Sequence, residues 1–507
     1  MPKATAEDQA IRAAITSFQF ASLLLILPVT GLGATFYVAV DGSDASGDGS
    51  LAEPWLTITH AVDSAADGDE IIVLPGVYHG RQRFRQEFDV PVTVRSQVPY
   101  AAKLRHDNGT ALIAYTARNI IIEGFDIAHA PGNTGALVVH VQDLLGDVSG
   151  SAGGTDPVVS GIVFRNNIIH SSTNNDLLKI NNGAEDILVE GNLFFNQSGS
   201  DEHIDINSVI GVTVQDNIFL NTADRPDTSS FIVIKDSNGN DDTVLGANDI
   251  TIRRNVFLNW YGSEGQGFVR VGEDGTANFE AFDILIENNL MLGNSGNMMR
   301  SPFTVQGARD VVFRNNTLVG DMPARSFAAR LIAVSANPAN ENIVIHNNIY
   351  SDPSGTMGSE AFIGVYLFDA PPAQNHSVAL DNNLYFNGDN PIPVDDGQFL
   401  TYQDDAKAVI GNPLLPVQTG LVAPAWDGEA FADGSQTIRE AFIKLVDLYA
   451  IPAAGSPVID NANPDHAPQD DILGNPRGPT PDIGALETNP DFSKIFTDRF
   501  ESGGRGL

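Results

Sequence analysis

The stretch that decides the fold is DITIRRNVFLN, Asp249–Asn259. Alternating apolar residues form one short β-branched strand pattern, an asparagine (Asn255) follows, and a second short apolar strand comes next. Such alternation is typical of a strand with one face buried. The pattern recurs at Asn119–Ala130, Ser160–Ser171, Asp186–Gln197, Gly211–Thr222, Asp283–Asn294, Asp310–Asp321, Asn342–Pro353 and Ser377–Gly388.

The spacing of the asparagines indicates a solenoid of stacked coils. Intervals start at 25 residues, between Asn167 and Asn192, and reach 38, between Asn217 and Asn255. One such unit cannot bury its own apolar face, so neighbouring units must pair strand to strand. At about 4.8 Å between coils, nine copies predict roughly 40 Å of parallel sheet. The asparagines fall at Asn167, Asn192, Asn217, Asn255, Asn289, Asn316, Asn348 and Asn383, with Phe125 in the equivalent place of the first copy.

The repeated asparagine has a structural explanation. Asparagine tolerates the left-handed backbone conformation that a sharp bend between strands needs. Asparagines stacked in successive coils can also form a hydrogen-bonded ladder. We therefore expect the ladder to be scaffold and not a site.

Together these features resemble the right-handed parallel β-helix of secreted, pectate-lyase-like proteins, over roughly residues 35–400. The resemblance implies an all-β solenoid, residues 35–395, with an N-terminal capping helix within Pro54–Ala66. The repeat then fades, and residues 396–487 are expected to form a closing segment that contains a helix at Thr437–Tyr449. The fold hosts lyases, hydrolases, adhesins and inert stalks, so it does not fix the function.

Composition narrows the possible partners. The 28 Lys and Arg stand against 64 Asp and Glu, a net charge of −36, and no basic patch is visible. Nucleic-acid binding is therefore not expected, whereas Ca²⁺ is a possible ligand. The absence of cysteine removes disulfides, thiolate zinc sites and thiol nucleophiles.

The first 34 residues read as a signal peptide. Phe20–Leu27 is an apolar run too short to cross a membrane, and small residues precede Thr35. The chain is thus expected to be secreted, extracellular, on the cell surface or periplasmic, with no transmembrane segment. Its tail, residues 488–507, is similar to terminal tags of some secreted Gram-negative proteins. We expect a monomer.

The strands between the asparagine copies hold the polar residues that could carry chemistry. These strand segments, aligned on their inward residue, are LLKINN, HIDINS, FIVIKDS and FVRVGED, the last ending at Asp274. The alignment places Lys235 beside Asn207. It puts Arg270 two residues out of register with Lys235. Only seven lysines occur in the chain, and Lys179 and Lys235 are the two within the repeats. Ion pairing with nearby carboxylates is the structural alternative.

This face resembles that of β-helical alginate and chondroitin lyases, which neutralise a uronate carboxylate and abstract the adjacent proton. The resemblance implies an acidic polysaccharide as partner, cleaved by β-elimination. The predicted catalytic residues are Lys235 as the general base, Arg270 as charge partner or acid, and His203. The predicted substrate-binding residues are Asn207, Arg300 and Glu273, and Asp201, Glu202 and Asp205 are the predicted Ca²⁺ ligands.

Two other functions stay open. A glycoside hydrolase of this fold would use the carboxylates of Ser200–Asp205. A cell-surface adhesin or glycan-binding protein would need only the repeats and the closing segment.

Overall fold

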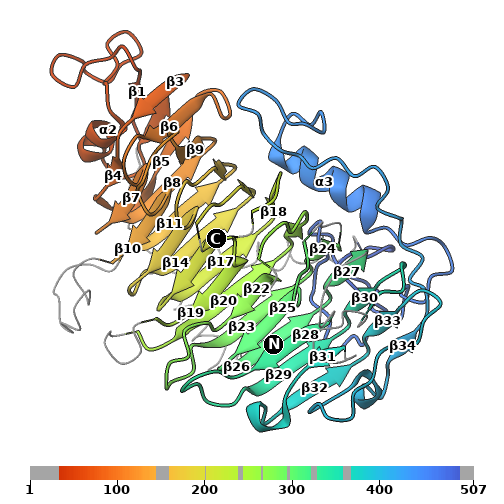
Figure 1. Cartoon of the computed structure of the whole chain (residues 1–507). Coiled ribbons are helices and arrows are strands. Elements are labelled where there is room, and N and C mark those ends of the chain that lie inside the picture. The colour runs from red at the N-terminus through yellow and green to blue at the C-terminus, as the bar shows by residue number, and fades with distance from the viewer. Residues whose placement is uncertain are drawn as a thin grey trace, which may run out of the picture. The chain divides into compact units, whose positions relative to one another are not determined.

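Three long parallel sheets wind around one axis in the computed structural model, which describes residues 33–143, 159–199, 201–225, 227–237, 244–263, 267–293, 297–320, 328–357 and 367–491. Each coil contributes one strand to each sheet in turn, so every strand pairs with the strand one coil away (Figure 1). This is the predicted right-handed parallel β-helix. All described elements belong to one unit, Ala34–Leu507. The expected signal peptide and most of the tail lie outside the described residues.

Sheet A holds the first strand of each repeat. Its strands are β1 (Thr35–Val38), β2 (Glu70–Val73), β5 (Glu87–Ser96), β8 (Arg118–Glu123), β11 (Ser160–Arg165), β14 (Glu185–Glu190), β17 (Ile210–Gln215), β20 (Ala247–Arg253), β23 (Ala281–Glu287), β26 (Ala308–Arg314), β29 (Glu341–His346) and β32 (Val378–Asp381).

Sheet B holds the strand after the asparagine. Its strands are β3 (Gly76–His79), β6 (Ala102–His106), β9 (Asp126–His129), β12 (Ile168–His170), β15 (Leu193–Phe195), β18 (Ile218–Leu220), β21 (Val256–Phe257), β24 (Leu290–Gly293), β27 (Thr317–Gly320), β30 (Ile349–Ser351), β33 (Leu384–Phe386) and β34 (Val409–Ile410).

Sheet C completes each coil. Its strands are β4 (Gln82–Phe84), β7 (Leu112–Tyr115), β10 (Val139–Gln142), β13 (Leu178–Asn181), β16 (Glu202–Asn207), β19 (Ser230–Lys235), β22 (Gly267–Val271), β25 (Phe303–Gln306), β28 (Ala329–Ile332) and β31 (Phe368–Asp369). The helices are α2 (Ile58–Ser64), α3 (Ile438–Tyr449) and the short 3₁₀ turns η2 (Pro372–Gln374) and η3 (Tyr402–Asp404).

The asparagine ladder forms between sheets A and B and is fully buried. The backbone N–H of Asn255 donates to Asn289 Oδ1 at 2.9 Å, and its side-chain amide donates to the Val214 carbonyl at 2.9 Å. The ladder begins where Phe125 N–H donates to Asn167 Oδ1, and it ends on the carboxylate of Asp405. The predicted hydrogen-bonded ladder is therefore confirmed.

The left-handed conformation falls elsewhere than predicted. It belongs to the residue before each ladder asparagine and not to the ladder asparagine itself. Arg254 and Asn288, for example, have φ of 53° and 54°. The ladder side chain must point inward to satisfy buried backbone groups, so the preceding residue makes the bend.

Both predicted helices exist, and one of them differs in extent. The N-terminal helix is shorter than Pro54–Ala66, because it starts at Ile58, where Thr57 caps it by accepting the His60 N–H. Helix α3 lies along the flank of the coil, beside sheet B (Figure 1). Its apolar stripe packs on the outward apolar residues of sheet B, such as Leu220 and Val256. The closing segment thus covers the side of the solenoid.

Candidate functional site

The outer face of sheet C carries polar residues that the sequence pattern indicated as candidates for a functional site. Asp205 pairs in register with Lys179 on one side and Val233 on the other, and Val233 pairs with Arg270. Lys235 pairs with Asn207. The registers expected from the sequence alignment are therefore those of the structure, and the cations of β13, β19 and β22 share one face.

These cations are held in a continuous ion network. Asp205 accepts a hydrogen bond from Lys179 and lies 3.8 Å from Lys235 Nζ. Glu273 joins the next coil, because its two oxygens lie 2.5 Å from Lys235 Nζ and 2.7 Å from Arg270 Nη1. Arg270 also donates to Gln306 Oε1 at 2.9 Å. Glu273 is thus the partner of two cations, and its predicted role in substrate binding stays a prediction.

A cluster of three buried carboxylates lies at the edge of this network. Asp176, Glu202 and Asp205 each place one oxygen within 4.8 Å of the others, and each is at most 1% exposed. One buried oxygen of each, Oδ2 of Asp176, Oε2 of Glu202 and Oδ1 of Asp205, has no hydrogen-bond partner among the described residues. Burial raises the pKa of both Asp176 and Glu202. Hard oxygen donors with unused lone pairs fit a Ca²⁺ ion.

The predicted ligand set differs from this cluster by one residue. Asp201, which was expected to bind the ion, is not a member, and Asp176 takes its place. Asp176 belongs to the preceding coil, where its Oδ1 accepts the Glu202 N–H at 3.1 Å. Sequence proximity favoured Asp201, whereas coil stacking brings in a residue 26 positions away.

Lys235 is a fixed cation in this environment. Burial by itself would lower its pKa, but Asp205, Glu273, Glu202 and Asp274 together raise the pKa above its ordinary value. A lysine in this state cannot accept a proton. The predicted role of Lys235 as the general base therefore does not fit the protonation state that its surroundings impose.

His203 faces the interior. Its ring stacks on that of Phe231, with centroids 4.3 Å apart, and its Nε2 lies 3.3 Å from Asn221 Oδ1. Complete burial lowers its pKa to about 3. A neutral ring inside the core cannot contact a polymer outside it, so the predicted catalytic role of His203 is excluded by its position.

The remaining predicted substrate-binding residues are Asn207 and Arg300. Asn207 is 3% exposed, with its amide hydrogen-bonded to the Ser237 hydroxyl. Arg300 lies half-buried in the turn before β25.

Sequence reasoning missed Tyr115 and His140 on the same face. His140 pairs in register with Lys179, one coil along, and its Nδ1 lies 2.7 Å from the Tyr115 hydroxyl oxygen. A signal was present, because VVHVQD (Val138–Asp143) repeats the alternation of LLKINN. Both side chains are half-buried.

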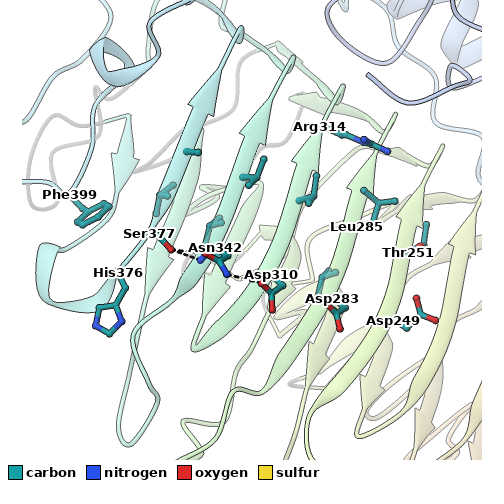
Figure 2. A pocket seen from close by; sticks show the side chains of 16 residues that line it. Asp249, Thr251, Asp283, Leu285, Asp310, Arg314, Asn342, His376, Ser377 and Phe399 are labelled. Carbon is teal, nitrogen blue, oxygen red and sulfur yellow. Dashed lines mark hydrogen bonds between the residues drawn. The ribbon is translucent and has the colours of Figure 1, made fainter. Parts of the chain in front are cut away.

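A separate groove of about 920 Å³ crosses the outer face of sheet A (Figure 2). Its floor is aliphatic, as at Leu285 and Val312, and Asp249, Asp283 and Asp310 line one edge. These three aspartates have φ of 53–55°, so the bend at the start of each strand already explains their residue type. Arg314 on the opposite side is bound to Glu287 at 2.8 Å. The groove does not offer the clustered cations of sheet C.

Comparison with known proteins supports the fold. No protein-family model matches the chain. A pectate lyase structure, Pel9A, aligns over 90% of this chain and 98% of its own, with a TM-score of 0.51 and 15% identity. A GH136 lacto-N-biosidase structure from Eubacterium ramulus aligns over 70% of this chain and 68% of its own, with a TM-score of 0.45 and 12% identity. The chain therefore shares the right-handed parallel β-helix fold with this pectate lyase structure.

One curated sequence is similar over a limited region. Lacto-N-biosidase of Bifidobacterium longum subsp. longum is 25% identical over 195 residues, which are 37% of this chain. The match spans 10% of the length of that protein. No described helix of the present chain is long and apolar enough to cross a membrane.

Proposed function

We propose that this protein acts on an acidic, uronate-containing polysaccharide by β-elimination, and that the polymer lies across the outer face of sheet C. The observation that carries the proposal is the gathering of Lys179, Lys235 and Arg270 on one face. In a chain of net charge −36, these three cations are the groups on this face with which an anionic polymer can pair.

The cations supply the positive charge that β-elimination needs first. The uronate carboxylate must be neutralised before the adjacent C5 proton becomes acidic enough to leave. Lys179 is suited to this role, because its side chain is 23% exposed whereas that of Lys235 is 9% exposed. Arg270, at 12%, borders the same face and can orient a neighbouring sugar.

A calcium ion would be held by Asp176, Glu202 and Asp205. Bound there, it would supply positive charge beside Asp205. Asp205 is also the partner of Lys179 and Lys235. The charge of the ion would weaken the ion pair between Asp205 and Lys179. The Lys179 ammonium group would then be available to a uronate carboxylate.

The test is an incubation of the whole protein with alginate, polygalacturonate and chondroitin, each with and without calcium. The proposal expects ultraviolet absorbance from an unsaturated product on at least one polymer, and a decrease of at least about 100-fold in Arg270→Ala. Absence of that absorbance on every polymer would refute β-elimination. Binding without cleavage would instead indicate an adhesin.

A glycoside hydrolase is the second candidate, and the local similarity to lacto-N-biosidase favours it. Hydrolysis needs two accessible carboxyl groups about 5–5.5 Å apart for retention, or about 6.5–9.5 Å apart for inversion. The clustered carboxylates lie within 4.8 Å and are buried, which disfavours this chemistry. New reducing ends without an unsaturated product would support it.

We also propose that the protein is secreted and acts as a monomer. The observation that supports secretion is the apolar run at Phe20–Leu27 followed by small residues. Size-exclusion chromatography with light scattering and N-terminal sequencing of the exported protein would test both statements.

A further inference from the structure

Tyr115 and His140 form a hydrogen-bonded pair on the same face of sheet C as Lys179. Tyr115 ends β7, and His140 lies in the next coil, in β10. The Tyr115 hydroxyl is 2.7 Å from His140 Nδ1, and the two rings meet edge to face with centroids 5.3 Å apart. Lys179 follows in register one coil further on, about 4.8 Å away.

The hydrogen bonds around His140 determine its tautomer. His140 Nε2 lies 2.9 Å from Asn181 Oδ1, while the amide nitrogen of Asn181 donates to Asn182 Oδ1 at 3.2 Å. Because Asn181 Oδ1 can only accept, Nε2 carries the imidazole proton. Nδ1 is then the acceptor, and the phenol of Tyr115 donates to it. The pair is therefore aligned for transfer of the phenolic proton to the imidazole.

The pair rests in the protonation states from which that transfer starts. Burial lowers the pKa of His140 to about 4, and nearby Lys179 and Arg81 act in the same direction against Asn181 and Asp205. His140 is thus neutral near pH 7 and able to accept a proton. Burial raises the pKa of Tyr115, so its hydroxyl keeps its proton until a reaction removes it.

Resting on the proposed function, we infer that Tyr115 and His140 are the acid–base pair of the elimination, with Lys179 as the cation for the uronate carboxylate. Their exposure and protonation differ from those of Lys235, which carboxylates hold as an ammonium group. The site acts on a uronate residue that lies across β7, β10 and β13. In this arrangement an imidazole activates a hydroxyl group and a third group orients the imidazole, as in a catalytic triad.

The step balances without another reactant. The phenolic oxygen of Tyr115 takes the proton from C5 of the uronate while its own proton passes to His140 Nδ1. The C5–H electron pair becomes the C4–C5 double bond, and the C4–O4 bond breaks with its electrons on O4. The proton on Nδ1 returns through the phenol to O4. The imidazolium formed in between is stabilised at Nε2–H by Asn181 Oδ1.

The experiment compares Tyr115→Phe and His140→Gln with wild type on the polymer that gives an unsaturated product. We expect kcat/KM to fall at least about 100-fold in each, with KM little changed. Tyr78→Phe is the matched control. Tyr78 also donates hydrogen bonds, to the carbonyls of Val38 and Leu74, but lies on sheet B. This variant should keep wild-type kcat.

The pH profile separates a catalytic role from a structural one. Because His140 must be neutral, wild-type kcat/KM should rise with pH through about 4, and that limb should be absent from the residual activity of His140→Gln. Circular dichroism establishes that each variant is folded.

Two outcomes overturn different statements. If wild type yields an unsaturated product and both variants retain its kcat/KM, the assignment of Tyr115 and His140 is wrong while the proposed function stands. If wild type yields no unsaturated product on any uronate polymer, the proposed function and this assignment fail together.

Discussion

Lys235 Nζ lies 2.5 Å from Glu273 Oε2, and both side chains are largely withdrawn from solvent. Removing Lys235 takes away a cation that Asp205, Glu273, Glu202 and Asp274 share, and breaking a buried ion pair in this way costs about 3 kcal/mol or more. We therefore expect Lys235→Met to lower the free energy of unfolding by about 3 kcal/mol, measured by urea denaturation.

The control for this ion pair is Lys407→Met. The Lys407 side chain is 57% exposed and lies 3.4 Å from Asp381, so its loss should cost less than about 1 kcal/mol. Equal losses in the two variants would show that burial adds nothing to the Lys235 pair.

Asn255 is fully buried and bonded on both sides in the ladder. Asn255→Ala would leave the backbone and side-chain N–H groups of Asn217 without their acceptor. Each buried unsatisfied group costs about 1–3 kcal/mol, so we expect a loss of about 3 kcal/mol or more in thermal or urea unfolding. Asn461→Ala, at an exposed position of the closing segment, should change stability much less.

Calcium binding at Asp176, Glu202 and Asp205 should release protons. Because the pKa values of Asp176 and Glu202 are raised, the ion must displace protons from them, and its affinity should rise with pH. Isothermal titration in two buffers of different ionisation enthalpy measures both quantities. Asp176→Asn should weaken binding at least about tenfold, whereas Asp249→Asn, on the rim of the sheet A groove, should not. Heats that are unaffected by Asp176→Asn would place the ion elsewhere.

Asp126 should make stability depend on acid pH. Burial would raise its pKa, but His170 and Arg105 more than compensate, and the pKa falls to about 2. A depressed folded-state pKa stabilises the fold above the unfolded value near 3.8, and the gain is lost as pH falls towards 2. A difference of this size corresponds to about 2 kcal/mol.

Urea unfolding at several pH values between 6 and about 2 checks this expectation. Asp126→Asn should remove that part of the pH dependence. It should also loosen the closing segment, since Trp426 Nε1 donates to Asp126 Oδ2 at 3.2 Å. The fluorescence of Trp426 would report the change. Asp89→Asn, whose side chain is 83% exposed, should leave the pH dependence as in wild type.

The repeated sequence pattern was enough to predict the stacked coils of the solenoid. Period-two alternation and a recurring asparagine depend on local chemistry alone, so the solenoid, the ladder and the coil-to-coil register of Lys179, Asp205 and Arg270 could be predicted. Register follows because a slip of one residue would turn every apolar side chain outward.

The tertiary structure decided the site. Alternation breaks at the start of β16, so both His203 and Ile204 pack in the core, a fact that a strand pattern cannot reveal. Stacking brought Asp176 to Glu202, and four surrounding carboxylates fixed the charge of Lys235. Sequence names the residues that can ionise, but their protonation depends on burial and on charges that only the folded chain brings within reach.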